Sequence, residues 1–272
     1  MACLPVAGLA MVIGTGSASA ARTPANTKAA AVAALEHLLK GVHSTNHAVR
    51  GPLSITAPAQ SKSTNWAGYA DTGSKFTKIS GTWTEPAVKC GSAQALAVFW
   101  VGIDGFNSQT VEQDGTLAFC QGGGAAPQYF TWWEMFPSNS IQLVGKTVKP
   151  GDHFAASVVR TGTKYALKVT DSTRGGNSFT KNKTCAAATC KDTSAEWIAE
   201  APTSSGSIVP LPNFGTWTGS NSAVSGGGKS GTIKSFADTE ITMVNNGGKV
   251  KAQPGPLNAK GNQFKVTWKS ST

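Results

Sequence analysis

Two glutamates in the 272-residue chain occupy positions where burial would suit a carboxyl group to general acid–base chemistry. Alternation of side chains along a strand places Glu134, within residues 128–136, on the same face as Trp132. Glu196 stands in the middle of a second run that contains an aromatic residue, residues 194–200. Apolar neighbours remove water from a carboxyl group and raise its pKa, which favours proton transfer. Either glutamate alone is a weak signal, since a mid-strand glutamate more often lies on a solvated face.

Histidine usage limits the other chemistries open to this chain. Of the four histidines, His37, His43 and His47 fall in a short N-terminal segment, which leaves His153 alone in the main body. A Ser-His-Asp triad, a Cys-His pair or a multi-histidine zinc site would have to be built around that one residue. It follows a Lys-Pro-Gly-Asp turn, so we interpret it as a solvated turn histidine. No metal and no cofactor are expected.

A tripeptide beginning at Asp71 has the Asp-Thr-Gly sequence of an aspartic-peptidase motif. That chemistry needs two aspartates that share one proton. No second copy is present, because Asp114 begins Asp-Gly-Thr and Asp238 begins Asp-Thr-Glu. We therefore interpret the tripeptide as part of a hairpin turn.

The N-terminal part predicts export and a propeptide. Residues 4–13 are apolar, and the small residues that follow end in Ala-Ser-Ala at position 20, which is typical of a secretory signal and its cleavage site. Residues 28–40 carry the one convincing helix pattern, which Gly41 ends, and a Ser/Pro/Thr-rich connector follows. The alternative for this segment is an ordinary disordered N-terminus. We expect a secreted, extracellular protein with a signal peptide at 1–20, a propeptide and linker at 21–63, and a single domain at 64–272.

The cysteines predict two disulfides. Cys3 would leave with the signal peptide, and an even number would remain in an exported chain. Three pairings of the remainder are possible. We favour Cys90–Cys120 and Cys185–Cys190, because only four residues separate the second pair.

Charge and hydropathy exclude two classes of partner. Lys and Arg outnumber Asp and Glu by 24 to 14, a net charge of +10. The basic residues are scattered singly and follow no zinc-finger, RNP or homeodomain-like spacing, which argues against nucleic acid. No run after the signal approaches the ~20 apolar residues of a membrane span. We expect a monomer that binds neither nucleic acid nor a membrane.

Beyond residue 64 the sequence predicts an all-β fold. Short runs of β-branched and aromatic residues alternate with Gly, Pro, Asn and Asp, and no helix pattern interrupts them. Many short strands separated by turn residues indicate a β-sandwich or a β-barrel. Residues 226–228 and 246–262 are interpreted as loops. The expected strands are 66–70, 77–84, 95–104, 109–113, 128–136, 152–160, 164–171, 194–200, 231–236, 240–245 and 263–268.

Five linked motifs follow one another over most of residues 64–245. They are Asn65-Trp66-Ala67-Gly68; Trp100-Val101-Gly102-Ile103-Asp104-Gly105 leading to Gln113-Asp114-Gly115; Trp132-Trp133-Glu134-Met135-Phe136-Pro137; Ala195-Glu196-Trp197-Ile198; and Val209-Pro210 with Phe214. Together they resemble the glutamic peptidases, the eqolisin or G1 family. The resemblance implies an antiparallel β-sandwich of concanavalin-like type, secretion with a propeptide, and acid endopeptidase activity on polypeptides that pepstatin does not inhibit.

The same resemblance implies roles for individual residues. At the matching positions the catalytic glutamate is Glu196 and the catalytic glutamine is Gln113. Gln109 lies close to the second position, and Gln113 is preferred because it directly precedes an Asp-Gly turn. The residues that match the cleft and its support are Asp104, Trp132, Glu134, Trp66 and Trp100.

The implied chemistry needs neither histidine, nor cysteine, nor metal. A carboxylate can take a proton from water while a side-chain amide donates a hydrogen bond to the oxyanion. The basic propeptide is expected to inhibit the enzyme until acidification, with Lys40 or Arg50 attracted to the carboxylates of the cleft. The rival functions are a β-sandwich glycoside hydrolase with Glu134 and Glu196 as its paired carboxylates, and a carbohydrate-binding module with tryptophans as sugar platforms.

Overall fold

The structure, a computed structural model, describes Met1 and residues 24–40, 42–43, 48–49, 59–73, 75–145, 147–186 and 189–272. The signal peptide expected at 1–20 lies outside the described residues apart from Met1, and Arg50 lies outside them entirely. None of the described helices has the length and apolar character needed to cross a membrane.

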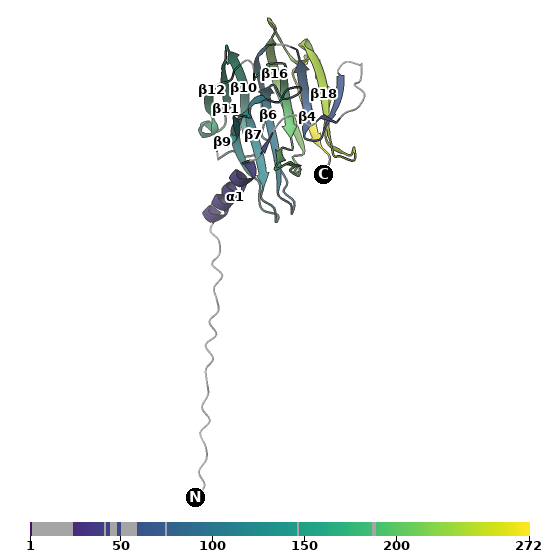
Figure 1. The fold of residues 1–272 in the computed structure, drawn as a ribbon. Coiled ribbons are helices and arrows are strands. Elements are labelled where there is room, and N and C mark those ends of the chain that lie inside the picture. Colours follow the sequence, from purple (N-terminus) through teal and green to yellow (C-terminus); the bar gives the residue numbers. More distant parts are fainter. Residues whose placement is uncertain are drawn as a thin grey trace.

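The strands form two antiparallel layers that pack face to face (Figure 1). The first layer contains, in spatial order, β9 (Asn139–Leu143), β8 (Gln128–Phe136), β7 (Val111–Cys120), β6 (Ala95–Ile103), β13 (Ser194–Glu200), β4 (Trp66–Thr72) and β18 (Ala237–Val244). The second layer contains β12 (Phe179–Thr184), β11 (Lys164–Asp171), β10 (His153–Thr161), β5 (Phe76–Thr84), β16 (Thr216–Gly226) and β17 (Lys229–Gly231).

Smaller elements complete the two layers. The first half of β16 pairs with β20 (Phe264–Trp268) and its second half with β5, so this strand passes from one layer to the other. β3 (Ala59–Ser63) pairs in parallel with β18. The remaining elements are α1 (Pro24–Leu39), β1 (Val42–His43), β2 (Ala48–Val49), β14 (Thr203–Ser204), β15 (Ser207–Ile208), β19 (Val250–Pro254) and the short 3₁₀ helices Gly175–Asn177 and Ile233–Ser235.

Alternation along the strands divides the apolar side chains into two clusters. One fills the space between the layers, where Phe99 and Trp197 of the first layer meet Phe154 and Leu167 of the second. The other covers the opposite face of the first layer and includes Trp100. A sheet whose two faces are both apolar is typical of a central layer. The predicted antiparallel β-sandwich, preceded by a short helix, is confirmed.

The strand expected at 231–236 is wrong. Residues Ile233–Ser235 form a 3₁₀ helix between β17 and β18. The backbone N–H of Thr232 donates to the hydroxyl of Ser235, and a capping box closes the turn. Hydroxyl side chains that bond to nearby backbone groups compete with strand pairing, which explains the difference.

The two stretches interpreted as loops also contain strands. β19 lies within 246–262, and β16 extends to Gly226. β16 has few β-branched residues, but buried and more exposed side chains alternate along most of it. Neighbouring strands on both sides supply the pairing that its composition does not indicate.

The strand expected at 109–113 was too short, since β7 runs from Val111 to Cys120 and is buried throughout. The connector before residue 64 likewise ends in an ordered strand, β3, whose polar sequence gave no strand signal.

Two disulfides join the pairs of cysteines that the sequence favoured. Cys90 is bonded to Cys120 with a Cα–Cα distance of 5.5 Å, and Cys185 to Cys190 with a Cα–Cα distance of 6.1 Å. The first fixes the end of β7 to the segment before β6. The second closes a short loop that leads into β13.

Candidate active site

The two residues expected to perform catalysis lie on one face of the first layer, with β6 between their strands. Glu196 of β13 is paired directly with Gly102 of β6, and Gly102 is paired in turn with Gln113 of β7. Gln113 is paired with Glu134 of β8. Directly paired residues of antiparallel strands point to the same face. The register therefore forms a row of Glu196, Gln113 and Glu134, with a glycine in the gap.

Gly102 stands between the glutamate and the glutamine at a position with no room for a side chain. A Cβ atom at this position would lie 2.9 Å from the indole ring of Trp100 and 3.0 Å from the Cβ of Gln113. Neighbours in a close-packed region would have to shift to accept such contacts. The importance of this glycine follows from the register of β6 against β7 and β13, which no local pattern reveals.

Gln113 is held by a short hydrogen bond. Its Nε2 donates to Glu134 Oε2 at 2.5 Å, and both side chains are fully buried. A primary amide carries two N–H donors, so a second one remains for another acceptor. Gln109 is exposed in the turn before β7. The structure thus places Gln113, and not Gln109, in the row with Glu196.

Glu196 is fully buried on this face. Burial raises the pKa of its carboxyl well above the usual value, the hydroxyl of Ser194 opposes this, and the negative charges of Asp104, Glu112 and Asp71 raise the pKa further. Apart from this hydroxyl, no described residue offers a donor to either carboxyl oxygen. In its ionised form, a carboxyl group with so few donors around it can bind a water molecule and take a proton from it.

Asp104 links the segments that lead to both proposed catalytic residues. It follows β6 in the left-handed region, with a φ of 68°. Its carboxylate accepts hydrogen bonds from the backbone N–H groups of Lys191, Asp192 and Thr193 at 2.8, 2.8 and 2.9 Å. These three residues directly precede β13, and the loop after Asp104 leads into β7. Asp104 therefore lies beside the row and supports it, rather than being part of it.

Tryptophans and a further glutamate continue this face. The rings of Trp66 and Trp100 meet edge to face, with centroids 4.9 Å apart. The indole N–H of Trp100 donates to Glu200 Oε2 at 2.8 Å, and Asn65 Nδ2 donates to Glu200 Oε1 at 3.4 Å. Burial and the charge of Glu134 raise the pKa of Glu200, which these donors oppose. Alternation places Glu200 on this face, but no motif assigned it a role.

Trp132 lies on the same face of β8 as Glu134 and is fully buried. Its indole N–H has no hydrogen-bond partner among the described residues. A buried indole donor normally finds an acceptor. Trp132 therefore offers a second donor on this face.

Helix α1 packs against this face, and Figure 1 shows it against one end of the sandwich. Its side chains Ala31, Leu35 and Leu39 are buried in the same apolar cluster as the three cleft tryptophans. The hydroxyl of Ser204 donates to the carbonyl of Leu38 at 2.9 Å, and β1 pairs with β14. The described part of the N-terminal segment is thus attached to the cleft face by apolar packing and backbone pairing.

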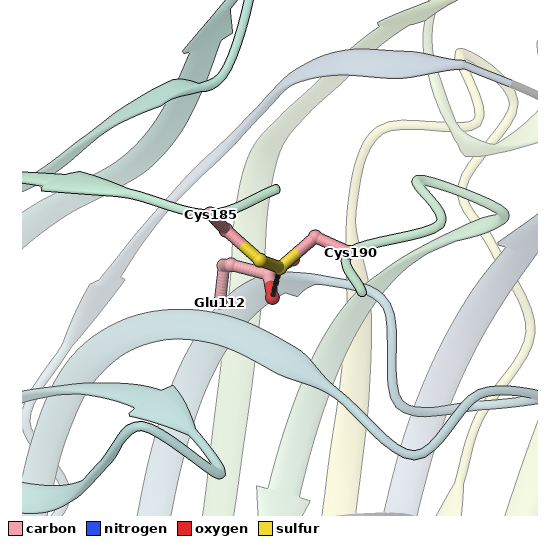
Figure 2. Close-up of side chains that lie close together, drawn as sticks. All are labelled: Glu112, Cys185 and Cys190. Atoms are coloured by element: carbon pink, nitrogen blue, oxygen red, sulfur yellow. Dashed lines mark hydrogen bonds between the residues drawn. A yellow bond between two sulfur atoms is a disulfide. The ribbon is translucent and has the colours of Figure 1, made fainter. Parts of the chain in front are cut away.

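One trio of potential metal ligands lies close together in the part of the chain that the structure describes. It consists of Glu112, Cys185 and Cys190 (Figure 2). The two sulfurs are bonded to each other, whereas zinc and similar ions bind thiolates. We therefore assign no metal to this trio.

An antiparallel β-sandwich with a buried glutamate opposite a glutamine has the architecture of a glutamic-type peptidase. The sequence profile of the Peptidase A4 family matches residues 64–267, and the chain belongs to this family. The resemblance to the glutamic peptidases is thereby confirmed.

Individual relatives agree with this assignment. The chain is 28% identical over 187 residues to aspergillopepsin-2 of Aspergillus niger, a match that covers 61% of this chain and 66% of that protein. It is 30% identical over 149 residues to scytalidopepsin B of Scytalidium lignicola, covering 54% and 55%. The matched part therefore spans less than two thirds of either relative. A structure of scytalido-glutamic peptidase with a peptide-based transition-state analogue shares the fold, with a TM-score of 0.64, 24% identity, and coverage of 76% of this chain and 98% of that one.

Proposed function

We propose that the chain is a secreted acid endopeptidase in which Glu196 activates water and Gln113 stabilises the oxyanion. The observation that carries the proposal is the row in which these side chains face each other across Gly102. Family membership and the peptidase relatives support the reaction class. The substrate proposed is a polypeptide, as the peptide-based analogue bound to scytalido-glutamic peptidase suggests.

The reaction follows from what each group can donate or accept. The ionised carboxylate of Glu196 takes a proton from water as the water oxygen attacks the peptide carbonyl carbon. The oxygen of the tetrahedral intermediate accepts a hydrogen bond from the amide N–H of Gln113 that Glu134 does not use. Glu196 then gives its proton to the leaving amine nitrogen, the C–N bond breaks, and the carboxylate is restored.

Carboxyl clustering supports activity in acid. Glu134, Glu196 and Glu200 share one buried face. Burial raises the pKa of Glu196 and of Glu200, and nearby charges add to it: Asp104, Glu112 and Asp71 at Glu196, and Glu134 at Glu200. Neighbouring carboxyl groups that repel one another lose their protons one after another, so one can be ionised while the next is still protonated. We expect full ionisation at neutral pH to be costly and activity to fall there.

The N-terminal segment at 21–63 is proposed as an inhibitory propeptide. Its helix packs on the cleft face through Leu35 and its neighbours, so it would compete with substrate. Lys40 is exposed, whereas Ala31, Leu35 and Leu39 are buried in an apolar cluster. Acidification alone would not weaken such packing, so we propose that activation requires cleavage between the helix and the peptidase domain at 64–272.

Digestion of acid-denatured haemoglobin by the purified protein tests the function. We expect activity in acid that resists pepstatin, chelators, and serine and cysteine peptidase inhibitors. Glu196→Gln and Gln113→Ala should each lower kcat by ~10²-fold or more, the usual cost of losing a base or an oxyanion donor. Gln109→Ala and Glu85→Gln are the matched controls, because one is an exposed glutamine nearby and the other a buried glutamate away from the row.

Several results would contradict the proposal. More than a tenth of the activity in folded Glu196→Gln or Gln113→Ala would remove that residue from the mechanism. Complete inhibition by a chelator or by pepstatin would exclude the reaction class. Release of reducing sugar from polysaccharide without proteolysis would favour the carbohydrate-active alternative, which the family match does not support.

A further inference from the structure

Glu112 directly precedes Gln113 in β7, so its side chain points to the opposite face, into the space between the two layers. It is fully buried, and its Oε1 lies 2.9 Å from the Sγ of Cys190 (Figure 2). Cys190 is bonded to Cys185. A disulfide sulfur has no hydrogen and can only accept. The hydrogen in this contact therefore belongs to the carboxyl group of Glu112.

The surroundings favour that protonated form. Burial raises the pKa of Glu112 well above its usual value, the charges of Asp104 and Asp192 raise it further, and Arg160 opposes them. Arg160 is itself paired with Asp192 at 3.0 Å, and the hydroxyl of Tyr165 donates to Asp192 at 2.7 Å. Glu112 Oε2 has no hydrogen-bond partner among the described residues. An ionised Glu112 would thus have two acidic neighbours and an arginine already engaged elsewhere.

The contact with Cys190 holds a segment on which the row depends. This segment, residues 190–193, is called the strap. Its backbone N–H groups at Lys191, Asp192 and Thr193 bind the carboxylate of Asp104, and the strap continues directly into β13. Glu112 thereby connects the strand that carries Gln113 to the segment that positions Glu196.

We propose that Glu112 is a positioning residue that holds the strap against β7, and with it the alignment of Gln113 and Glu196, only while its carboxyl is protonated. Loss of the proton leaves a carboxylate oxygen against sulfur lone pairs at 2.9 Å, without the hydrogen that joined them. The strap then separates from β7, and the hydrogen bonds to Asp104 are lost with it. This inference rests on the proposed peptidase function for its effect on catalysis, but not for its effect on the strap.

Hydrogen exchange of the strap tests the inference without using activity. Full-length Glu196→Gln protein, which would not digest itself, is compared with Glu196→Gln/Glu112→Gln at each pH by mass spectrometry. Glutamine keeps a donor for sulfur and cannot ionise. We expect equal protection of residues 189–193 at pH 4. Above the titration of Glu112, the Glu196→Gln protein, called the parent here, should lose protection ~10-fold per pH unit. The double variant should not.

Two controls separate this contact from general effects of buried charge. Asp114→Asn removes a second carboxyl group on the same face of β7, equally buried but without contact to the disulfide, and should leave the parent's pH dependence of the strap in place. Replacing both Cys185 and Cys190 by serine should abolish the difference between the parent and Glu112→Gln. The inference is wrong if Glu112→Gln retains the parent's pH dependence, or if Asp114→Asn abolishes it as well.

The kinetic consequence is measured in the active enzyme. Here Glu112→Gln is compared with the wild-type enzyme. The ratio of the variant's kcat to the wild-type kcat should rise ~10-fold per pH unit above the titration of Glu112, with little change in KM. A change confined to KM would contradict a positioning role. If the parent has no peptidase activity at any pH, the proposed function fails, and the exchange experiment still decides whether Glu112 holds the strap.

Discussion

Gln113 and Glu134, paired across β7 and β8, are joined by a hydrogen bond of 2.5 Å in which the amide donates to the carboxyl group. This contact fixes which end of the glutamine side chain carries its N–H groups toward the row. An amide that is already oriented loses no rotational freedom when it binds an oxyanion. In the proposed mechanism, Glu134 therefore acts through Gln113, as a positioning residue.

We expect Glu134→Ala to lower kcat by ~10²-fold with little change in KM, because the amide of Gln113 is then free to rotate away from the oxyanion. Glu134→Gln should retain more activity, since its carbonyl oxygen still accepts the hydrogen bond. Steady-state kinetics on a peptide substrate, with circular dichroism to verify folding, checks both. Equal losses in the two variants would show that the negative charge matters rather than the orientation.

Gly102→Ala should reduce activity at least ~10-fold, since its Cβ would displace Gln113 or Trp100 by a few tenths of an ångström or more. The matched control is Gly91→Ala, where a Cβ would meet nothing within 4 Å. Both kcat and the thermal midpoint should be measured. If Gly102→Ala keeps full activity, the absence of a side chain between Glu196 and Gln113 is not required.

The fold should be more stable in acid than near neutrality. Burial raises the pKa of Glu85 to about 8, above the ~4.3 of an exposed glutamate. The folded state favours the protonated form of Glu85. Its contribution to the free energy of unfolding is therefore fully present below pH ~4 and is lost as the pH rises through about 8.

Differential scanning calorimetry between pH 4 and pH 8 checks this expectation, and Tm should fall by at least ~4 °C over that interval. In Glu85→Gln the fall should be smaller, because the buried group no longer ionises. Glu240→Gln, at a partly exposed position, should leave the fall unchanged. A Tm that rises with pH would contradict the assigned direction.

Leu35→Lys in the unprocessed chain should raise acid peptidase activity ~10-fold or more, because lysine stays charged in acid and a charged side chain cannot be buried in the apolar cluster that holds α1 on the face that carries the row. Ala33→Lys changes an exposed position of the same helix and serves as the control. Activity should be followed together with mass spectrometry, so that release of the helix is distinguished from cleavage. An unprocessed parent that is already fully active in acid would remove the inhibitory role.

Much of the secondary structure of this protein can be predicted from short stretches of its sequence. Alternation of apolar and polar residues predicted most of the central strands, including those that carry Glu134 and Glu196, because side chains along a strand alternate between faces whatever its partners are. The helix was expected at 28–40 and begins earlier, at Pro24. An even number of cysteines in an apparently exported chain indicated disulfides, and the short separation of Cys185 from Cys190 favoured their pairing.

Other elements depended on partners that are distant in the chain. β3 pairs with β18, and β16 takes partners from both layers, so composition alone could not predict either strand. The sequence placed Glu200 on the face of Glu196, but its contacts with Trp100 and Asn65 appear only after β4, β6 and β13 are side by side.

The sequence by itself determined which residue types are present and on which face of its own strand each one lies. Only the tertiary structure decided that Glu196, Gly102, Gln113 and Glu134 fall in one row, since register is set between strands and a slip of one residue would move a whole strand's side chains to the other face. The same holds for Glu112, whose neighbour in the chain faces the cleft while its own carboxyl meets a disulfide on the other side of the sheet.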